Sequence, residues 1–147
     1  MSLDALKHRH GRSLKKYEIL RGSKPVSKLF SSARSVRGQF IKVLFAPLEL
    51  DGFEQVQLSL PQVLFVVGKK NISDAVSRNR IKRLMKEAYR HEKTAAIKCA
   101  GKHTGGGNQV LGMAFMYIGR ETVKPSPERF RKEIRSLLEG VVRMSPG

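Results

Sequence analysis

The segment 73–93 restricts the possible folds more than any other part of the chain. At about 100° per residue, a helix over this segment gathers four apolar side chains on one side: Ile81, Leu84, Met85 and Ala88. The opposite side gathers Asn79, Arg83, Lys86 and Arg90, with Lys82 beside them and with Arg78 and Arg80 flanking the apolar stripe. An amphipathic helix needs a packing partner for its apolar side. The chain must therefore fold against that side and leave the basic side in solvent.

The basic side of this helix carries charge of one sign. Residues 69–90 hold eight Lys and Arg against two acids, Asp74 and Glu87. If this helix face had no role beyond solvation, we would expect acidic and basic side chains to alternate on it, because i,i+4 pairs of opposite charge stabilise helices. The whole chain has a formal charge of +17, which indicates an anionic partner. Nucleic acid is favoured over a membrane surface, because the release of counterions from phosphates drives binding by Lys and Arg.

Length and composition narrow the class of protein. The 147 residues fit one domain, and 40% hydrophobic residues are enough for a core. The basic start of the chain lacks the apolar stretch of a secretory signal, and the longest near-apolar stretch, 110–119, is about half of a membrane span. The single cysteine, Cys99, excludes an internal disulfide. We therefore expect a soluble protein of the reducing cytoplasm.

Apolar periodicity and turn residues predict an α+β fold, a two-layer sandwich in which a sheet is packed with helices. The first strand is expected to stop at Pro47, and Gly112 suggests a bulge in the last one. The expected elements, in order, are a helix with Ser23 as N-cap, strands over 39–46 and 63–67, a helix opened by Ser73, a strand over 110–118 and a helix with Ser126 as N-cap.

The expected organisation is a single domain with short ends. We predict a basic, flexible N-terminal extension over 1–22, the domain over 23–142 and a C-terminal tail over 143–147. The sequence assigns no function to the extension, to the acidic stretch 47–62 or to the glycine-rich loop 101–108.

The residues in and just before the basic helix resemble the signature of a known protein family. They read Val66-Val67-Gly68-Lys69-Lys70, then Asp74-Ala75-Val76-Ser77-Arg78-Asn79-Arg80-Ile81-Lys82-Arg83, and then Glu87 and Arg90. This pattern resembles the signature of the bacterial ribonuclease P protein component, in which paired lysines after a strand lead into an arginine-asparagine-arginine helix. The resemblance implies a fold of the ribosomal protein S5 domain 2-like type, with the basic helix in a crossover between neighbouring parallel strands.

The resemblance also implies a function. The family's protein does not cut RNA itself: it binds a large catalytic RNA, and the two together remove the 5′ leader of precursor tRNA with Mg²⁺ in the RNA active site. The resemblance implies no catalytic residue and no metal ligand in the protein. Phe30 and Phe40 become candidates for a cleft that holds the leader, although both could equally be core residues. The implied RNA-binding residues are Lys69, Lys70, Arg78, Asn79, Arg80, Lys82, Arg83, Lys86 and Arg90.

Other readings of the sequence remain weaker. A ribosomal or RNA-chaperone protein without a nuclease role would have a similar composition. Whether leader-bearing and leaderless tRNA bind differently would distinguish such a protein from a ribonuclease P protein. A DNA-binding basic helix of the zipper type needs heptads after Arg90, and none follow. Cys99 and His103, with His91 upstream, do not complete a zinc site. Residues 101–104, Gly-Lys-His-Thr, resemble the tail of a phosphate-binding loop that lacks its first glycine.

Overall fold

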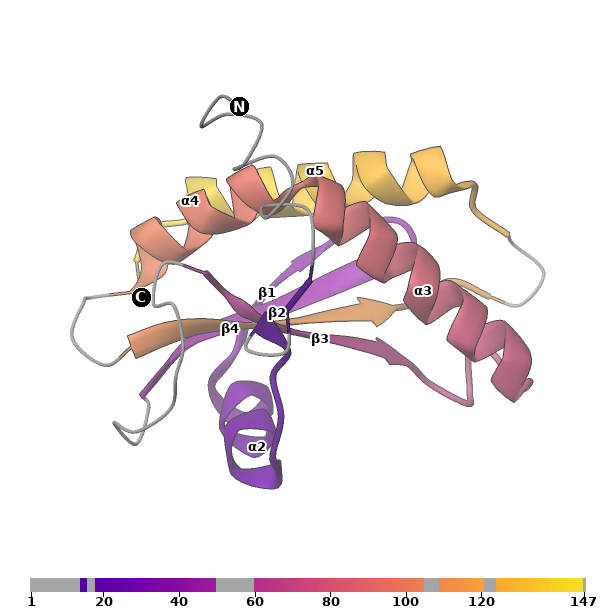
Figure 1. Cartoon of the computed structure of the whole chain (residues 1–147), viewed down its shortest axis with the longest axis horizontal. Coiled ribbons are helices and arrows are strands. Elements are labelled where there is room, and N and C mark those ends of the chain that lie inside the picture. Colours follow the sequence, from indigo (N-terminus) through magenta and orange to yellow (C-terminus); the bar gives the residue numbers. More distant parts are fainter. Residues whose placement is uncertain (1–13, 16–17, 50–59, 105–108, 121–123, 147) are drawn as a thin grey trace, which may run out of the picture.

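The computed structural model describes residues 14–15, 18–49, 60–104, 109–120 and 124–146 (Figure 1). Four strands form one sheet in the order β1-β2-β4-β3. β1, β2 and β4 are antiparallel neighbours, whereas β3 and β4 run parallel. The elements, in chain order, are α2 (Ser23–Ser32), β1 (Arg34–Arg37), β2 (Ile41–Glu49), β3 (Gln62–Val67), α3 (Ala75–His91), α4 (Lys93–His103), β4 (Gln109–Tyr117) and α5 (Pro127–Arg143).

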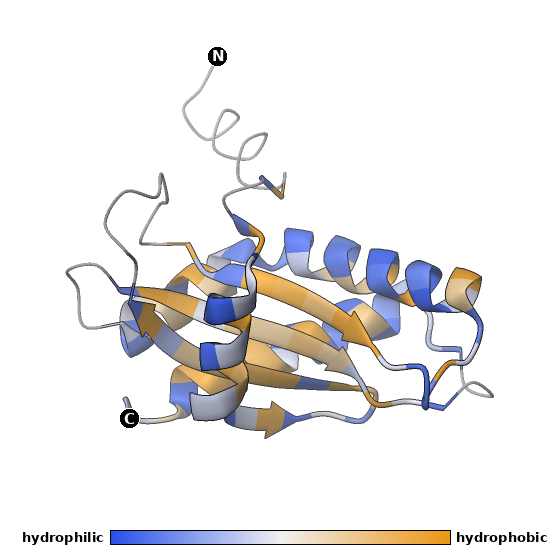
Figure 2. Cartoon of the chain, turned by 90° about the horizontal axis from the view of Figure 1, so that it is seen from below, coloured by the Kyte–Doolittle hydropathy of each residue, from blue (hydrophilic) through white to orange (hydrophobic). Residues whose placement is uncertain are grey.

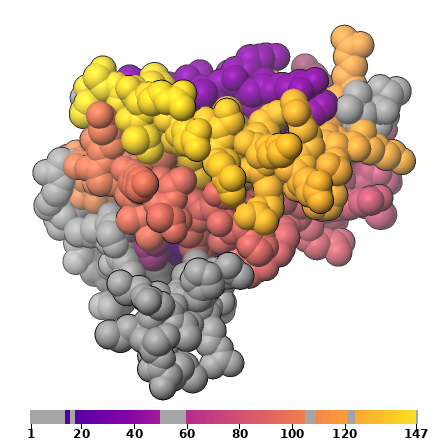
Figure 3. Space-filling view, turned by 90° about the horizontal axis from the view of Figure 1, so that it is seen from above, coloured from indigo at the N-terminus to yellow at the C-terminus, as the bar shows by residue number. Residues whose placement is uncertain are grey.

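Helices cover the sheet from both sides. α3, α4 and α5 lie on one face and α2 lies on the other (Figure 1). Seen from the side of the three helices, α5 lies next to both α3 and α4, and the three together cover this face of the sheet (Figure 3). Because β3 and β4 are parallel neighbours, the chain between them has to cross over the sheet, and α3 and α4 form that crossover. This is the position that the resemblance implied for the basic helix.

The main core lies between the sheet and the three helices. Alternate residues of each strand point to it, among them Val43, Phe65 and Phe115, which are at most 6% exposed. A smaller cluster on the other face joins Leu29 of α2 to Ala46, Leu48, Val110 and Ala114 of the sheet. β4 is central and buried on both faces, which explains why its sequence is apolar almost throughout. The strands are accordingly the most hydrophobic part of the molecule (Figure 2).

All six expected elements are confirmed, with small shifts at their ends. Asp74, not Ser73, is the N-cap of α3, and its carboxylate accepts the N–H of Ser77 at 3.0 Å. Gly22, with φ 92°, occupies the cap position before α2, so Ser23 is already helical. Ser126 is the N-cap of α5 as predicted, and its hydroxyl accepts the N–H of Arg129 at 3.1 Å.

Two expectations about β2 and β4 were wrong. β2 continues through Pro47 to Glu49. This is tolerated because β1 pairs only with residues 42–45 of β2, so that β2 has an open edge at Pro47. Gly112 forms no bulge, since it pairs in register with both Ala46 and Gln62. Its missing side chain instead makes room for Leu48, whose Cδ1 would lie 2.6 Å from a Cβ at this position.

Two elements were not predicted. β1 is four residues long and contains one apolar residue, Val36, so it gives almost no alternating pattern. α4 begins directly after Glu92 and includes residues 101–103, which we had expected in a loop. The stretch 50–59 and residues 105–108 lie outside the described residues, so the expectations for the acidic stretch and for the rest of the glycine-rich loop are not tested there.

Candidate nucleic-acid interface

α3 presents its basic side to solvent because its other side is fixed in the core. Met85, Ala88 and Tyr89 are at most 1% exposed, and the Tyr89 ring meets Phe65 of β3 edge to face at 5.9 Å. Burial raises the pKa of the Tyr89 hydroxyl, with a further contribution from the nearby Glu18 carboxylate. α3 is mostly hydrophilic in Figure 2, which displays the charged side that the packing leaves open.

The predicted RNA-binding residues fall into two groups. The first group is held in place by internal contacts and consists of Arg78 and Arg90. Arg78 donates to the carbonyls of Ile72 and Ser73 at 2.9 and 2.7 Å, which braces the turn before α3. The second group is exposed and consists of Lys69, Lys70, Asn79, Arg80, Arg83 and Lys86, while Lys82 is half-buried.

The acids of α3 are engaged by their neighbours. Glu87 forms a two-pronged ion pair with Arg90, at 2.5 and 3.2 Å, and its Oε1 lies 3.2 Å from His91 Nε2. The hydrogen bond from Arg90 holds the pKa of the Glu87 carboxyl below its usual range. Hydrogen bonds from Ser77 lower the pKa of Asp74 in the same way. Both carboxylates therefore accept hydrogen bonds, but within the described part of the chain only Glu87 is paired with a cation.

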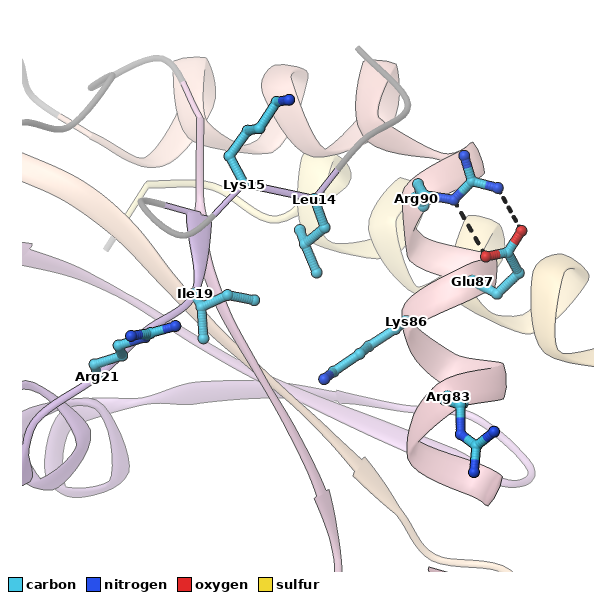
Figure 4. Close-up of a pocket in the computed structure, with 8 residues that line it drawn as sticks. All are labelled: Leu14, Lys15, Ile19, Arg21, Arg83, Lys86, Glu87 and Arg90. Carbon is cyan, nitrogen blue, oxygen red and sulfur yellow. Dashed lines mark hydrogen bonds and ion pairs between the residues drawn. The ribbon is translucent and has the colours of Figure 1, made fainter. Parts of the chain in front are cut away.

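A groove runs between α3 and the segment that precedes α2 (Figure 4). It has a volume of about 390 Å³. In the close-up, Lys86 extends from α3 toward Ile19, and the Arg90–Glu87 pair lies one turn further along α3. Five of the lining residues are basic and one is acidic; the full lining is Leu14, Lys15, Ile19, Arg21, Arg83, Lys86, Glu87 and Arg90.

The segment that forms the second wall of this groove was expected to belong to a flexible extension. The structure instead packs Glu18, Ile19 and Leu20 against the folded body. Ile19 forms a parallel bridge with Val63 at the open edge of β3, and the N–H of Leu20 donates to the Val63 carbonyl at 2.8 Å. The signal that sequence reasoning overlooked is this apolar pair, Ile19-Leu20, within an otherwise basic stretch.

A buried ion pair anchors the same segment. The Glu18 carboxylate is 1% exposed, and its two oxygens lie 2.8 and 2.9 Å from Lys93 Nζ at the start of α4. The N–H of Lys15 donates to Glu18 Oε2 at 2.7 Å. Because a buried charge is costly unless it is paired, this contact fixes the segment at the junction between α3 and α4.

A second cavity lies at the other end of α3. It has a volume of about 400 Å³, and Arg80 lines it together with Lys124 from the segment before α5. Its remaining walls include apolar side chains of the main core, among them Ile81, Leu84 and Phe130. The groove thus lies beside the basic side of α3, whereas this second cavity lies beside its apolar side and has Arg80, Lys124 and Asp74 as charged lining residues.

The structure does not bring the two leader-cleft candidates together. Phe30 is 42% exposed on α2, on one face of the sheet. Phe40 is half-buried against the main core on the opposite side, where the Arg129 guanidinium lies 5.6 Å from the centre of its ring. Its N–H and that of Ile41 donate to the buried Glu133 carboxylate of α5 at 2.7 and 2.5 Å.

The residues once considered for zinc are occupied by other partners. Cys99 Sγ lies 3.3 Å from the Leu138 carbonyl, and His103 Nε2 lies 2.6 Å from the Val141 carbonyl, both on α5. His91 faces Glu87 instead. Within the described ranges, no three His, Cys, Asp or Glu side chains lie close enough to hold a metal ion.

Comparison with known proteins places this geometry in a family. The family model for ribonuclease P matches residues 14–141. The ribonuclease P protein component of Chlorobaculum tepidum is 39% identical over 137 residues, which cover 93% of this chain and 88% of the relative. The chain belongs to the ribonuclease P protein family. A second relative, from Chlorobium phaeobacteroides, is 40% identical over 136 residues and 90% of each chain.

Solved structures of ribonuclease P proteins share the fold. The protein from Thermotoga maritima superposes with a TM-score of 0.58 at 18% identity, over 87% of this chain and 98% of that one. The protein from Staphylococcus aureus gives a TM-score of 0.56 at 15% identity, over 83% and 93%. The α+β fold and the family predicted from the motif are thereby confirmed, and the ribosomal or RNA-chaperone alternative gains no support.

The family match begins at residue 14 and therefore includes the segment that lines the groove. A ribonuclease P protein takes part in tRNA processing. RNA is therefore the class of ligand to consider for a basic groove on this chain. Across the part of the chain that the structure describes, no helix is long and apolar enough to cross a membrane.

Proposed function

We propose that this chain is the RNA-binding subunit of a ribonuclease P, which holds the catalytic RNA and the 5′ leader of precursor tRNA. The observation that carries the proposal is the exposed basic side of α3 together with the groove beside it. The groove adds Lys15 and Arg21 to the cations of α3 and has apolar patches at Leu14 and Ile19. Single-stranded RNA is held by such a combination of positive charge and apolar surface.

The mechanism that this surface supports is electrostatic. Exposed arginines such as Arg80 and Arg83 can form forked contacts to phosphate oxygens. Each neutralised phosphate releases counterions and lowers the repulsion between two RNA molecules. We infer that the protein in this way lets the catalytic RNA and the substrate approach one another and favours the binding of Mg²⁺ by the RNA.

We place the catalytic centre and its Mg²⁺ in the RNA subunit. In support, the two carboxylates of α3 already have other roles, since Asp74 caps the helix and Glu87 pairs with Arg90. We also place the protein in the cytoplasm. In support, Cys99, the single cysteine, is a free and fully buried thiol, so the described fold uses no disulfide.

For the leader, the proposal favours Phe30 over Phe40. Phe30 lies on α2, and α2 covers only part of its face of the sheet (Figure 2). On that same face Lys42, Met116 and Val66 form a row across three strands and are only half-buried. The exposed Phe30 ring lies on the same side of the sheet as this row and is open to stacking with an unpaired base, whereas the Phe40 ring is already in contact with Arg129.

Substrate discrimination tests this proposal. The assembled enzyme should bind leader-bearing precursor tRNA more tightly than leaderless tRNA, and Phe30→Ala should reduce that difference about fivefold or more if stacking is worth about 1–3 kcal/mol. Ile97→Ala is the matched control, since Ile97 is 44% exposed on α4, on the other side of the sheet. Equal affinity for the two tRNAs would favour a general RNA-binding protein. A lower melting temperature with an unchanged preference would make Phe30 a packing residue.

A further inference from the structure

A third cavity lies far from the groove and has no place in the function proposed above. Its volume is about 620 Å³, and it opens where the end of α4 meets the ends of α2 and β2 and the C-terminal segment. Figure 1 shows the end of α4 and the C-terminus together at one end of the molecule, while α3 begins at the opposite end. An RNA contact here would be separate from the one on α3.

The walls of this cavity are basic and polar. Arg34 and Lys102 line it, together with His103, Thr104 and Gln109, and none of the described residues of its lining is acidic. The Lys102 side chain is exposed and makes no hydrogen bond or ion pair with the described part of the chain. The described walls of the cavity therefore carry positive charge that a phosphate would neutralise.

Arg34 is already oriented for a ligand. One of its terminal nitrogens donates to the Ser145 carbonyl at 2.6 Å, and its guanidinium lies 5.5 Å from the centre of the Phe45 ring. These two contacts fix the plane of the guanidinium and leave further N–H groups for a second acceptor. Because the side chain is held before binding, less rotamer entropy is lost when a ligand arrives.

His103 gives the cavity a second, different polar group. The ring is 7% exposed and packs against Phe45 at 5.1 Å. Its Nε2 lies 2.6 Å from the Val141 carbonyl, and a carbonyl can only accept, so Nε2 carries the hydrogen.

From these contacts we propose that the cavity binds a nucleotide through its phosphate, with Lys102 and Arg34 as the phosphate-binding side chains. The proposal rests on RNA being the partner of this chain, and it adds a second contact point. Residues 101–104 resembled the tail of a phosphate-binding loop in sequence, but the first three end a helix here rather than start one. The phosphate is thus bound by side chains and not by the amides of a helix N-terminus.

Binding of mononucleotides to the full chain, without the catalytic RNA, tests the proposal. Uridine 5′-monophosphate, uridine and the trinucleotide UpUpU would be titrated while the amide resonances of Lys102, Thr104 and Gln109 are followed by NMR. The monophosphate should shift these resonances saturably and bind at least about fivefold more tightly than uridine. If UpUpU also binds here, the phosphate comes from an RNA backbone; if it does not, the ligand is a free nucleotide.

Lys102→Gln and Lys98→Gln form the matched pair of variants, because both lysines are exposed on α4 but only Lys102 lines the cavity. Lys102→Gln should weaken binding of the monophosphate about fivefold or more, and Lys98→Gln should not change it. The proposal is overturned if uridine binds as well as its monophosphate, if the two variants behave alike, or if only resonances of α3 shift. Since this readout needs no cleavage, it is independent of the test of the ribonuclease P role.

Discussion

At the scale of single residues, the arginines of α3 differ in what they contact. Arg78 and Arg90 are bound to a carbonyl pair and to Glu87, whereas Arg80 and Arg83 point to solvent. Helical periodicity alone could place all four on or beside the basic side, but it could not show which of them fold back onto the protein. That distinction depends on the turn at Ile72 and Ser73, whose carbonyls lie within reach only in the folded chain.

The exposed pair is expected to dominate RNA binding. Arg80→Ala combined with Arg83→Ala should weaken binding to the catalytic RNA and reduce the slope of log K against log salt by about one to two units, because each lost phosphate contact removes about one. The melting temperature should stay close to that of the wild type. Binding would be measured by filter retention at several salt concentrations.

The control keeps the change in net charge the same. Lys98→Ala combined with Lys132→Ala also removes two exposed cations, from α4 and α5. Its salt slope should match that of the wild type. Equal losses in the two double variants would mean that binding follows total charge and not the basic side of α3.

Cys99 gives a second prediction at this scale. Burial raises the pKa of its thiol from 9.0 to about 12. A raised pKa means that this group's contribution to stability is complete below pH 9 and is lost as the pH rises toward 12. A thiol reagent at pH 8 should therefore label Cys99 only after unfolding, and Cys99→Ser should flatten the loss of stability above pH 9. Rapid labelling of the native protein would contradict the buried position.

At the scale of elements, local signals account for what could be predicted. α3, β3 and α5 each have a strong apolar period or a clear cap, and each was found within a few residues of its true ends. α4 has a weaker pattern, and β1 is held by its pairing with β2 rather than by its own composition. The return of residues 18–20 to β3 depends on partners more than 40 positions away. The apolar pair Ile19-Leu20 signals a buried contact, but no local pattern identifies β3 as its partner.

The Glu18–Lys93 pair is expected to secure that return. Glu18→Gln removes the carboxylate that pairs with the buried Lys93 charge and should lower the free energy of unfolding by about 3–5 kcal/mol. Lys93→Met should have a similar effect. The double variant Glu18→Gln with Lys93→Met should lose less than the sum of the two, as measured by urea denaturation. Strictly additive losses would show that the two side chains do not interact across the α3–α4 junction.

At the scale of the whole molecule, exposed cations line cavities that are built from distant parts of the chain. The net charge, the family and the basic side of α3 could be predicted from the sequence. It could not be predicted that Lys15, Ile19 and Arg21 would line a groove beside α3, nor that Arg34 and Lys102 would line one cavity, because both depend on contacts between distant segments. If both proposals hold, the surface that contacts RNA is longer than α3 alone.

The most direct test of the central claim is cleavage of a precursor tRNA with a 5′ leader by a bacterial ribonuclease P RNA at low Mg²⁺, with and without this protein. The account predicts that the protein alone does not cleave, and that adding it to the RNA increases correctly placed cleavage. The Arg80→Ala, Arg83→Ala variant should lose most of this stimulation. No stimulation by a folded protein that still binds the RNA would contradict the claim that this chain is the protein subunit of a ribonuclease P.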